Sequence, residues 1–214
     1  MAKRSKLIKF HELGQMAGVI EYSDPDAENK LRVFLDPKKD LVLELACGKG
    51  EYAVALAALE PEKQFVGIDY QGERLWYGVR QIEEQHLNNL IFLRTKAEFL
   101  EKYFLPHSIS EIWITFPDPH PKDKRGHKRL ISPHYLKLYK KILKRDHLIH
   151  LKTDSDLLID KAIEAIDIVH GRVLLAMKNI DAFPDRPGIL DMQTTFEKRH
   201  RSKGDTINYL KFKI

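Results

Sequence analysis

The stretch from Asp40 to Tyr70, DLVLELACGKGEYAVALAALEPEKQFVGIDY, contains a complete strand–turn–helix–strand pattern. Its two ends, Asp40–Ala46 and Gln64–Tyr70, are short apolar runs of the kind that form buried strands. The segment EYAVALAALEP between them has a helical pattern, and Gly48 and Gly50 fall in the turn before it. This order predicts a β-α-β unit with two parallel strands.

The same alternation continues along the chain. Further apolar runs occupy Asn89–Thr95, Glu111–Phe116 and Asp146–Thr153, and a helical pattern follows each of them. Strands alternating with helices predict an α/β fold with a doubly wound, mostly parallel sheet covered on both faces. The last two strand-like runs, Arg172–Ile180 and Asp205–Ile214, have no long helical pattern between them. We therefore expect an antiparallel C-terminal hairpin to close the sheet.

The composition is that of one globular domain with a short extension. The chain has 214 residues, of which 43% are hydrophobic and 31% charged. Residues 1–39 are polar and weakly periodic, which predicts an N-terminal arm ahead of a main domain at 40–214. No apolar run approaches the roughly 18 to 20 residues of a membrane span. The N-terminus lacks the apolar region of a secretory signal, and the single Cys47 excludes an intramolecular disulfide. We expect a cytoplasmic protein.

Positive charge is concentrated in one segment. The whole chain has a net charge of +5, but between Pro117 and His147 ten Lys and Arg face three Asp. A local basic patch on a nearly neutral body predicts binding of a polyanion at one face. The alternative is a solvated helix surface, which is the usual role of a run of charges.

Candidate ligand groups follow the first two strands of the opening stretch. In a doubly wound sheet, ligands bind beyond the carboxyl ends of the strands. Gly48 and Gly50 would let the backbone approach a ligand closely there, although neither a Walker loop nor a full G-x-G-x-x-G is present. Asp69 lies 19 residues after Gly50, a spacing typical of an acid that accepts both hydroxyls of a ribose. A helix N-cap is the alternative for Asp69. The combination predicts a nucleoside-type cofactor.

The segment FPDPHPKDKRGHKRLI, residues 116–131, follows the fourth strand of the alternation. Pro117 and Pro119 restrict the backbone on either side of Asp118, which fixes where the carboxylate points. A carboxylate can accept hydrogen bonds from the N1–H and amino groups of guanine, and the cations that follow would hold phosphates beside it. The alternative is a surface loop with an incidental Asp.

Four motifs together resemble one family. The segments LVLELACGKGEY, FPDPHPKDKRGHKRLI, LHLKTD and TTFEKRHRSKG are similar, in this order, to motifs of the bacterial tRNA (guanine-N7-)-methyltransferases. The resemblance extends from Leu41 to the C-terminus, and the proline–aspartate–basic signature is its most specific part. It implies a class I, Rossmann-like methyltransferase fold with a seven-stranded sheet. It also implies transfer of a methyl group from S-adenosylmethionine to N7 of a variable-loop guanosine in tRNA.

The resemblance also assigns roles to residues. Asp118 would be the catalytic carboxylate, touching cofactor and base. The other cofactor-binding residues would be Glu44, Gly48 and Gly50 near the methionine part, Asp69 at the ribose, and Lys96. The substrate nucleotide would contact Lys122, Asp154, Thr194, Thr195, Phe196 and Glu197. The RNA would lie along Lys124, Arg125, His127, Lys128 and Arg129.

This sequence departs from the family pattern at three positions. Ala46 replaces the first glycine of the cofactor turn, His120 replaces the tryptophan of the signature, and Lys96 replaces an acid or amide. Two assigned residues also have structural alternatives, which are a helix N-cap for Asp154 and a surface ion pair with Lys198 or Arg199 for Glu197.

Two other functions remain open at this point. One is a methyltransferase of the same fold that acts on another acceptor. The other is a non-catalytic RNA-binding protein that keeps the fold, which Ala46 and Lys96 favour. The histidines are scattered and Cys47 is alone, so we expect no metal site. The expected partner is tRNA, with no membrane, and the sequence leaves monomer and homodimer open.

Overall fold

The computed structural model describes residues 2–214, apart from the side chains of residues 2–6 and 123. The chain contacts divide it into two compact units, of which the first ends at Tyr103 and the second runs from Phe104 to Ile214. Among the described residues, each unit contains four strands together with helices.

The first unit is built on a parallel sheet. Its strands are β1 (Val19–Glu21), β2 (Leu41–Leu45), β3 (Gln64–Asp69) and β4 (Leu90–Arg94). They are arranged in the order β1-β4-β3-β2, and every neighbouring pair is parallel. The helices are α1 (Ala2–Leu13), α2 (Ala27–Phe34), α3 (Glu51–Leu59), α4 (Gly72–Gln85), the 3-10 turn η1 (Ala97–Phe99) and α5 (Leu100–Tyr103). All positions of β2 and β3 are buried, which explains why these strands are continuous apolar runs.

The segment predicted as an N-terminal arm contributes to this unit. Strand β1 pairs with β4, and Leu13 at the end of α1 is fully buried. The indole N–H of Trp76 on α4 donates to the carboxylate of Glu12 on α1 at 2.8 Å. Residues 2–39 therefore include a strand of the sheet, while a functional boundary at residue 40 stays a prediction.

The second unit has a mixed sheet. Its strands are β5 (Ile109–Thr115), β6 (Leu143–Thr153), β7 (Arg172–Met177) and β8 (Asn208–Lys213). Their order is β5-β6-β8-β7, with β5 parallel to β6 and β8 antiparallel to both of its neighbours. The helical segments are η2 (Asp123–Lys128), α6 (Pro133–Ile142), α7 (Asp156–Ile168), η3 (Ile180–Ala182), η4 (Gly188–Asp191) and α8 (Thr195–Arg201). The predicted antiparallel hairpin of β7 and β8 is thus confirmed.

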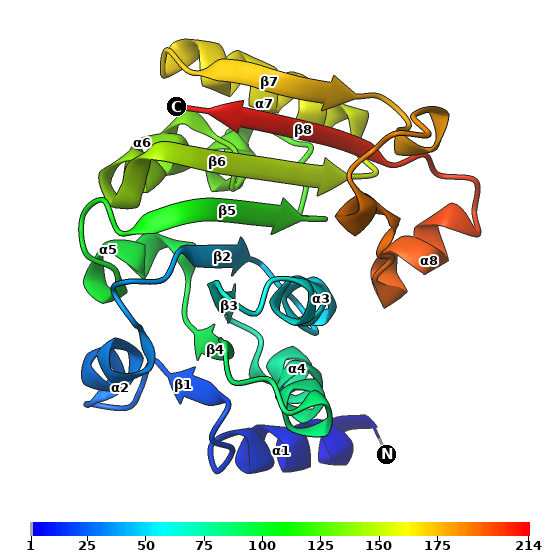
Figure 1. Ribbon diagram of the computed structural model, residues 1–214. Coiled ribbons are helices and arrows are strands. Elements are labelled where there is room, and N and C mark those ends of the chain that lie inside the picture. The colour runs from blue at the N-terminus through cyan, green and yellow to red at the C-terminus, as the bar shows by residue number, and fades with distance from the viewer. Residues whose placement is uncertain (1) are drawn as a thin grey trace. The chain divides into compact units, whose positions relative to one another are not determined.

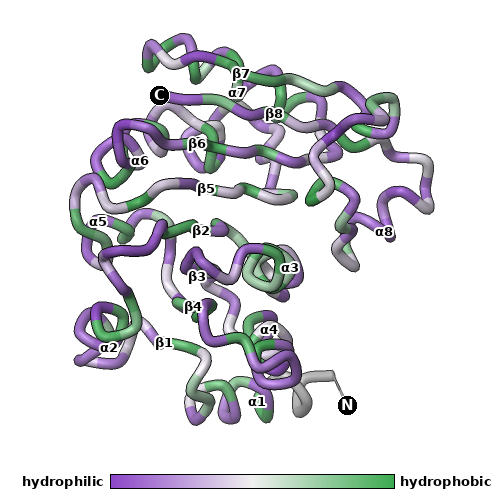
Figure 2. The backbone as a smooth tube through the Cα atoms, viewed as in Figure 1, coloured by the Kyte–Doolittle hydropathy of each residue, from purple (hydrophilic) through white to green (hydrophobic). Residues whose placement is uncertain are grey.

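The position of α8 matters for the site. Figure 1 shows α8 beyond the arrowheads of β5 and β6, at the carboxyl ends of these strands. Figure 2 shows α8 as mostly hydrophilic, in contrast to the hydrophobic α3. The long connection between β7 and β8 therefore brings polar side chains to the edge where ligands bind in this class of sheet.

The number of strands differs from the expectation. The prediction of seven strands is wrong, because the described residues form eight. The additional strand is β1, which has three residues and only one buried position, Ile20. Such a strand has no apolar run or alternation that sequence reasoning could detect. In the part of the chain that the structure describes, no helix has the length and apolar character needed to cross a membrane.

Candidate functional site

The turn after β2 has an unusual backbone. Ala46, Gly48 and Gly50 adopt positive φ angles of 56°, 58° and 70°. The Cys47 N–H donates to the Ile68 carbonyl at 3.0 Å, which ties the turn to the end of β3. This conformation costs a residue with a Cβ about 1 kcal/mol, so Ala46 is strained where the family pattern has glycine.

The two glycines of the turn have different roles. A Cβ added at Gly50 would lie 2.2 Å from the ring of Phe92, so only glycine fits there. Gly67 and Gly78 also crowd the Phe92 ring, at 2.4 and 2.5 Å from such a Cβ. At Gly48, in contrast, no atom lies within 4 Å of the added Cβ. Gly50 therefore packs the turn against β4, and Gly48 leaves open space beside the backbone for a ligand.

Asp69 holds the turn from the end of β3. Its Oδ2 accepts from the Gly48 N–H and its Oδ1 from the Gln71 N–H, both at 2.8 Å. Burial raises the pKa of the Asp69 carboxyl, and these two backbone hydrogen bonds oppose the rise. Gln71, not Asp69, is the N-cap of α4, so the alternative as a cap is not realised. Each carboxylate oxygen keeps acceptor capacity for a hydroxyl group.

Glu44, on β2, is buried inside the first unit. Its side chain is 3% exposed, and its Oε2 accepts from the Ala53 N–H in the first turn of α3 at 2.8 Å. The carboxylate therefore fixes the start of the helix that follows the glycine turn. Its contact with a cofactor stays a prediction.

A small cavity in the first unit is lined by Lys96 and by Tyr70, the residue that follows Asp69 in the sequence. It has a volume of about 140 Å³ and is lined by Tyr22, Tyr70, Thr95, Lys96 and Phe99. The rings of Tyr22 and Tyr70 are 6.1 Å apart, and the Lys96 ammonium lies 5.2 Å from the centre of the Tyr70 ring. Aromatic walls with one cation suit a flat, electron-rich ring. Sequence reasoning missed Tyr22, because nothing in a polar segment marks it as part of a pocket.

In the second unit, the loop after β5 fixes Asp118. Phe116 and His120 have positive φ angles of 49° and 39° on either side of it. The Oδ1 of Asp118 accepts from the His120 N–H at 3.0 Å, while its side chain is 71% exposed. The carboxylate is thus both oriented by its own loop and open to a ligand. This combination favours the functional interpretation over an incidental surface Asp.

The predicted RNA-binding cations divide into two groups. The side chains of Lys122, Lys124, Arg125, His127 and Lys128 are exposed. Arg129, in contrast, is only 6% exposed. Its Nε and Nη2 donate to the carbonyls of Pro119 and His120, at 3.0 and 2.9 Å. Arg129 therefore contacts the Asp118 loop itself.

The TTFE segment lies beside the same loop. The Thr194 hydroxyl caps α8 by accepting from the Glu197 N–H at 3.1 Å. Phe196 is 45% exposed, and its ring centre lies 5.3 Å from that of Phe116 and 4.2 Å from that of His200. Thr195 is exposed next to it. The structure thus brings Phe196 close to the residue that begins the Asp118 loop.

Glu197 points inward. Its side chain is fully buried, with Oε2 2.8 Å from the ammonium of Lys152 and Oε1 accepting from the Arg201 Nε at 2.9 Å. Lys152 also donates to the carbonyls of Leu190 and Met192, at 3.0 and 2.8 Å. Burial lowers the pKa of Lys152, and the Glu197 carboxylate opposes this shift. Glu197 is therefore in an ion pair, but a buried one with partners other than Lys198 and Arg199. Its contact with a base stays a prediction.

Asp154 belongs to a cluster with His200. The Nδ1 of His200 lies 2.9 Å from carboxylate oxygens of both Asp154 and Asp205. These three side chains hold potential metal-ligand atoms within 4.8 Å of one another, and here they contact each other through the imidazole. Ser155, not Asp154, is the N-cap of α7. Through His200, Asp154 lies next to Phe196, so two predicted substrate residues share one cluster.

Sequence reasoning missed the two cations that hold Glu197. Lys152 lies in the motif LHLKTD, and a lysine inside an apolar strand was the available signal, because an isolated buried ammonium is costly. Arg201 follows Glu197 by four residues, one helical turn. The pairing of Arg201 with Glu197 could be recognised only once Thr195–Arg201 was known to be a helix.

Similarity to solved structures defines the class of the protein. The structure of the 16S rRNA methyltransferase KamB superposes with a TM-score of 0.66 at 16% identity, covering 89% of this chain and 94% of that chain. A SAM-dependent methyltransferase from Aquifex aeolicus gives a TM-score of 0.56 at 13% identity, covering 96% and 98%. The chain has the α/β class I methyltransferase fold, as expected from the sequence.

Sequence similarity defines the family. The model of a family described as putative methyltransferase matches residues 38–210. The tRNA (guanine-N(7)-)-methyltransferase of Christiangramia forsetii is 37% identical over 226 residues, which cover 100% of both chains. The protein of that name from Bacteroides thetaiotaomicron is 34% identical over 99% of this chain and 86% of its own. This chain belongs to the tRNA (guanine-N7-)-methyltransferase family, as the four motifs predicted.

Proposed function

We propose that this protein transfers the methyl group of S-adenosylmethionine to N7 of a guanosine in the variable loop of tRNA. The observation that carries the proposal is the loop after β5, where an oriented and exposed Asp118 is followed directly by exposed cations. A methyltransferase for a small acceptor would not require those cations. Membership of the family supports the same substrate.

The residues of the first unit fit the cofactor. Gly48 offers backbone with open space beside it, and Asp69 offers two oriented acceptor oxygens for ribose hydroxyls. The cavity lined by Tyr22, Tyr70 and Lys96 offers aromatic walls to an adenine ring. Lys96 would donate to a ring nitrogen there, whereas the acid or amide of the family pattern accepts from the amino group. When bound, S-adenosylmethionine supplies an electrophilic methyl group.

The residues of the second unit orient the base and the backbone of the RNA. N7 of guanine has an in-plane lone pair, so no base has to remove a proton before attack, and catalysis consists mainly of alignment. Asp118 accepts from guanine N–H groups, and the exposed ring of Phe196 offers a stacking surface. Lys122 and the exposed cations after it bind phosphates. Thr194, Thr195 and Asp154 are further proposed nucleotide contacts, and a contact from Glu197 is tested below.

The Asp118→Ala variant tests this division of roles. We expect the methylation rate to fall below detection, because the oriented acceptor is removed. We expect the Kd for tRNA to change less than about threefold, because phosphate contacts provide most of the affinity. Single-turnover methylation and filter binding measure the two quantities, with Asp160→Ala on the exposed face of α7 as a matched control. A variant that methylates at the wild-type rate would contradict the proposed role of Asp118.

A further inference from the structure

We propose that Arg129 is a positioning residue for Asp118 rather than a contact to RNA. It lies in the cation-rich signature, but its guanidinium binds the backbone of the loop that presents Asp118. The inference rests on the proposed function, because it concerns the group that orients the reacting base.

The burial of Arg129 separates it from its neighbours. Arg129 is 6% exposed, whereas the side chains of Lys124, Arg125 and Lys128 are exposed. A Cβ added at Gly126 would lie 2.9 Å from Nη1 of Arg129, so the guanidinium packs directly over this glycine. A group enclosed in this way has little surface left for a phosphate.

The hydrogen bonds connect Arg129 to Asp118 through one residue. The His120 N–H donates to Oδ1 of Asp118 at 3.0 Å, and the His120 carbonyl accepts from Nη2 of Arg129 at 2.9 Å. The Pro119 carbonyl accepts from Nε of Arg129 at 3.0 Å. The two peptide carbonyls that follow Asp118 are thus fixed by one planar group, and the direction of the carboxylate depends on them.

The loop needs such support because it is strained. His120 has a positive φ of 39°, a conformation that is unfavourable for a residue with a Cβ. Strained conformations persist only when the surroundings hold them. Charge-assisted bonds from a guanidinium are strong, and its two parallel donors define an orientation that the single ammonium of a lysine cannot reproduce.

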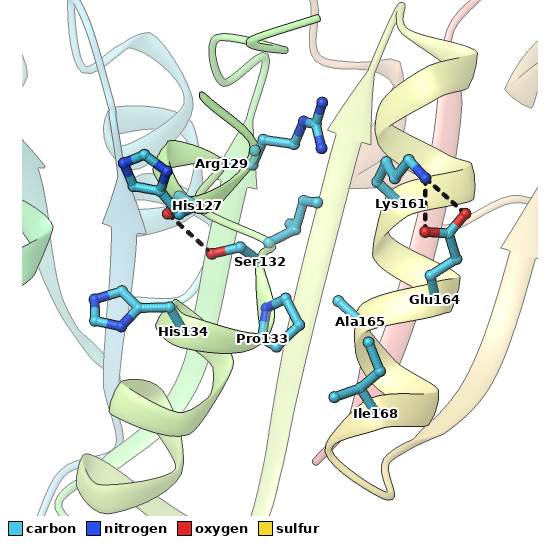
Figure 3. Close-up of a pocket in the computed structure, with 11 residues that line it drawn as sticks. His127, Arg129, Ser132, Pro133, His134, Lys161, Glu164, Ala165 and Ile168 are labelled. Carbon is cyan, nitrogen blue, oxygen red and sulfur yellow. Dashed lines mark hydrogen bonds and ion pairs between the residues drawn. The ribbon is translucent and has the colours of Figure 1, made fainter. Parts of the chain in front are cut away.

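Arg129 also lines a cavity. This cavity of about 290 Å³ lies between the start of α6 and α7, and Figure 3 shows Arg129 above Ser132 and opposite Lys161. Within α7, the Lys161 ammonium donates to both carboxylate oxygens of Glu164, three residues later, at 2.8 and 2.7 Å. Shortening Arg129 would enlarge this cavity, so the Tm of each Arg129 variant is measured by calorimetry together with its methylation rate.

The Arg129→Lys variant separates positioning from RNA binding, since it keeps the charge but removes the paired donors. At saturating tRNA and cofactor, we expect its methylation rate to fall at least about tenfold. Its Kd for tRNA and the salt dependence of that Kd should stay within about twofold of wild type. The comparator is Lys124→Ala with Arg125→Ala, which should weaken binding and reduce the salt slope by roughly one unit for each phosphate that is no longer neutralised. The control for the substitution itself is Arg32→Lys on α2, an exposed site.

Two results would overturn the proposal. One is an Arg129→Lys protein with the wild-type rate at saturating substrates. The other is an Arg129 variant that weakens tRNA binding and flattens its salt dependence as the comparator does. The wild-type protein is measured in the same assay. If it does not methylate tRNA, the proposed function fails, and this result is distinct from a failure of the positioning role of Arg129.

If Arg129→Lys does not fold, chemical labelling of arginines in the wild-type protein still tests whether Arg129 contacts RNA. Phenylglyoxal modifies accessible guanidinium groups, and peptide mass spectrometry locates them. We expect Arg125 to react in the free protein and to be protected by tRNA, while Arg129 stays unreactive in both states. Reaction of Arg129 in the free protein and its protection by tRNA would show that it binds RNA instead.

Discussion

At the scale of single residues, the buried ion pair of Lys152 and Glu197 explains how the connection before β8 is held. Lys152 comes from β6 and Glu197 from α8, and both side chains are fully buried. The same ammonium binds the carbonyls of Leu190 and Met192 before α8. One lysine therefore attaches several turns of an otherwise irregular connection to the sheet, close to the Asp118 loop.

The Glu197→Gln variant should be destabilised, because it leaves the Lys152 ammonium buried without its carboxylate. Breaking a buried ion pair costs about 3 kcal/mol or more. For a chain of this length this corresponds to a decrease in Tm of roughly 6 °C or more, measurable by calorimetry. Glu164→Gln on α7, where the pair with Lys161 is exposed, should change Tm by less than about 2 °C. An unchanged Tm together with an abolished methylation rate would show instead that Glu197 reads the base.

Residue roles were only partly predictable from the sequence. Asp69 and Asp118 could be found, because Asp69 ends a strand and Asp118 comes shortly after one, and both strands are recognisable as buried runs. Arg129 and Glu197 could not be distinguished from neighbouring charges. Whether a charged side chain in a basic loop or a short helix points outward or inward depends on packing that no local pattern records.

At the scale of elements, the end of β8 is attached to the start of β6 by His147. The imidazole Nδ1 lies 2.8 Å from the Lys144 carbonyl, and Nε2 accepts from the Ile214 N–H at 3.0 Å. These contacts require neutral imidazole with the proton on Nδ1. Burial lowers the pKa of His147, and the nearby charges of Lys213 and Lys140 lower it further.

This arrangement predicts a pH dependence of stability. Because the pKa of His147 is lower in the folded state, the unfolded chain binds the proton first as the pH falls through about 6.5. The free energy of unfolding should therefore decrease below this pH until the folded pKa is passed. Thermal unfolding between pH 7.5 and 5 should show a smaller loss of Tm in His147→Gln than in wild type. His11→Gln, at an exposed site, should keep the wild-type dependence, and equal losses in all three proteins would contradict this role of His147.

Elements differed in how well the sequence revealed them. Strands β2 to β5 and the second half of β6 could be predicted because both of their faces are largely buried, which gives a nearly continuous apolar run. The segment between β7 and β8 contains only the short helices η3, η4 and α8, of three to seven residues. Helices of this length have too few turns for a hydrophobic period, and here tertiary contacts hold them.

At the scale of the whole molecule, fold, family and site chemistry agree. The class I fold accommodates many acceptors, so it does not define the substrate by itself. The substrate follows from the Asp118 loop, its cations and the family relationship. A net charge of +5, concentrated beside Asp118, is consistent with a protein that binds a polyanion at one place.

The most direct test is methyl transfer from labelled S-adenosylmethionine to tRNA that lacks N7-methylguanosine, followed by nucleoside analysis of the product. We predict a single labelled nucleoside, N7-methylguanosine, derived from the variable loop. Label found only on an exocyclic amine or a ribose, or no transfer by folded protein, would contradict the proposed function.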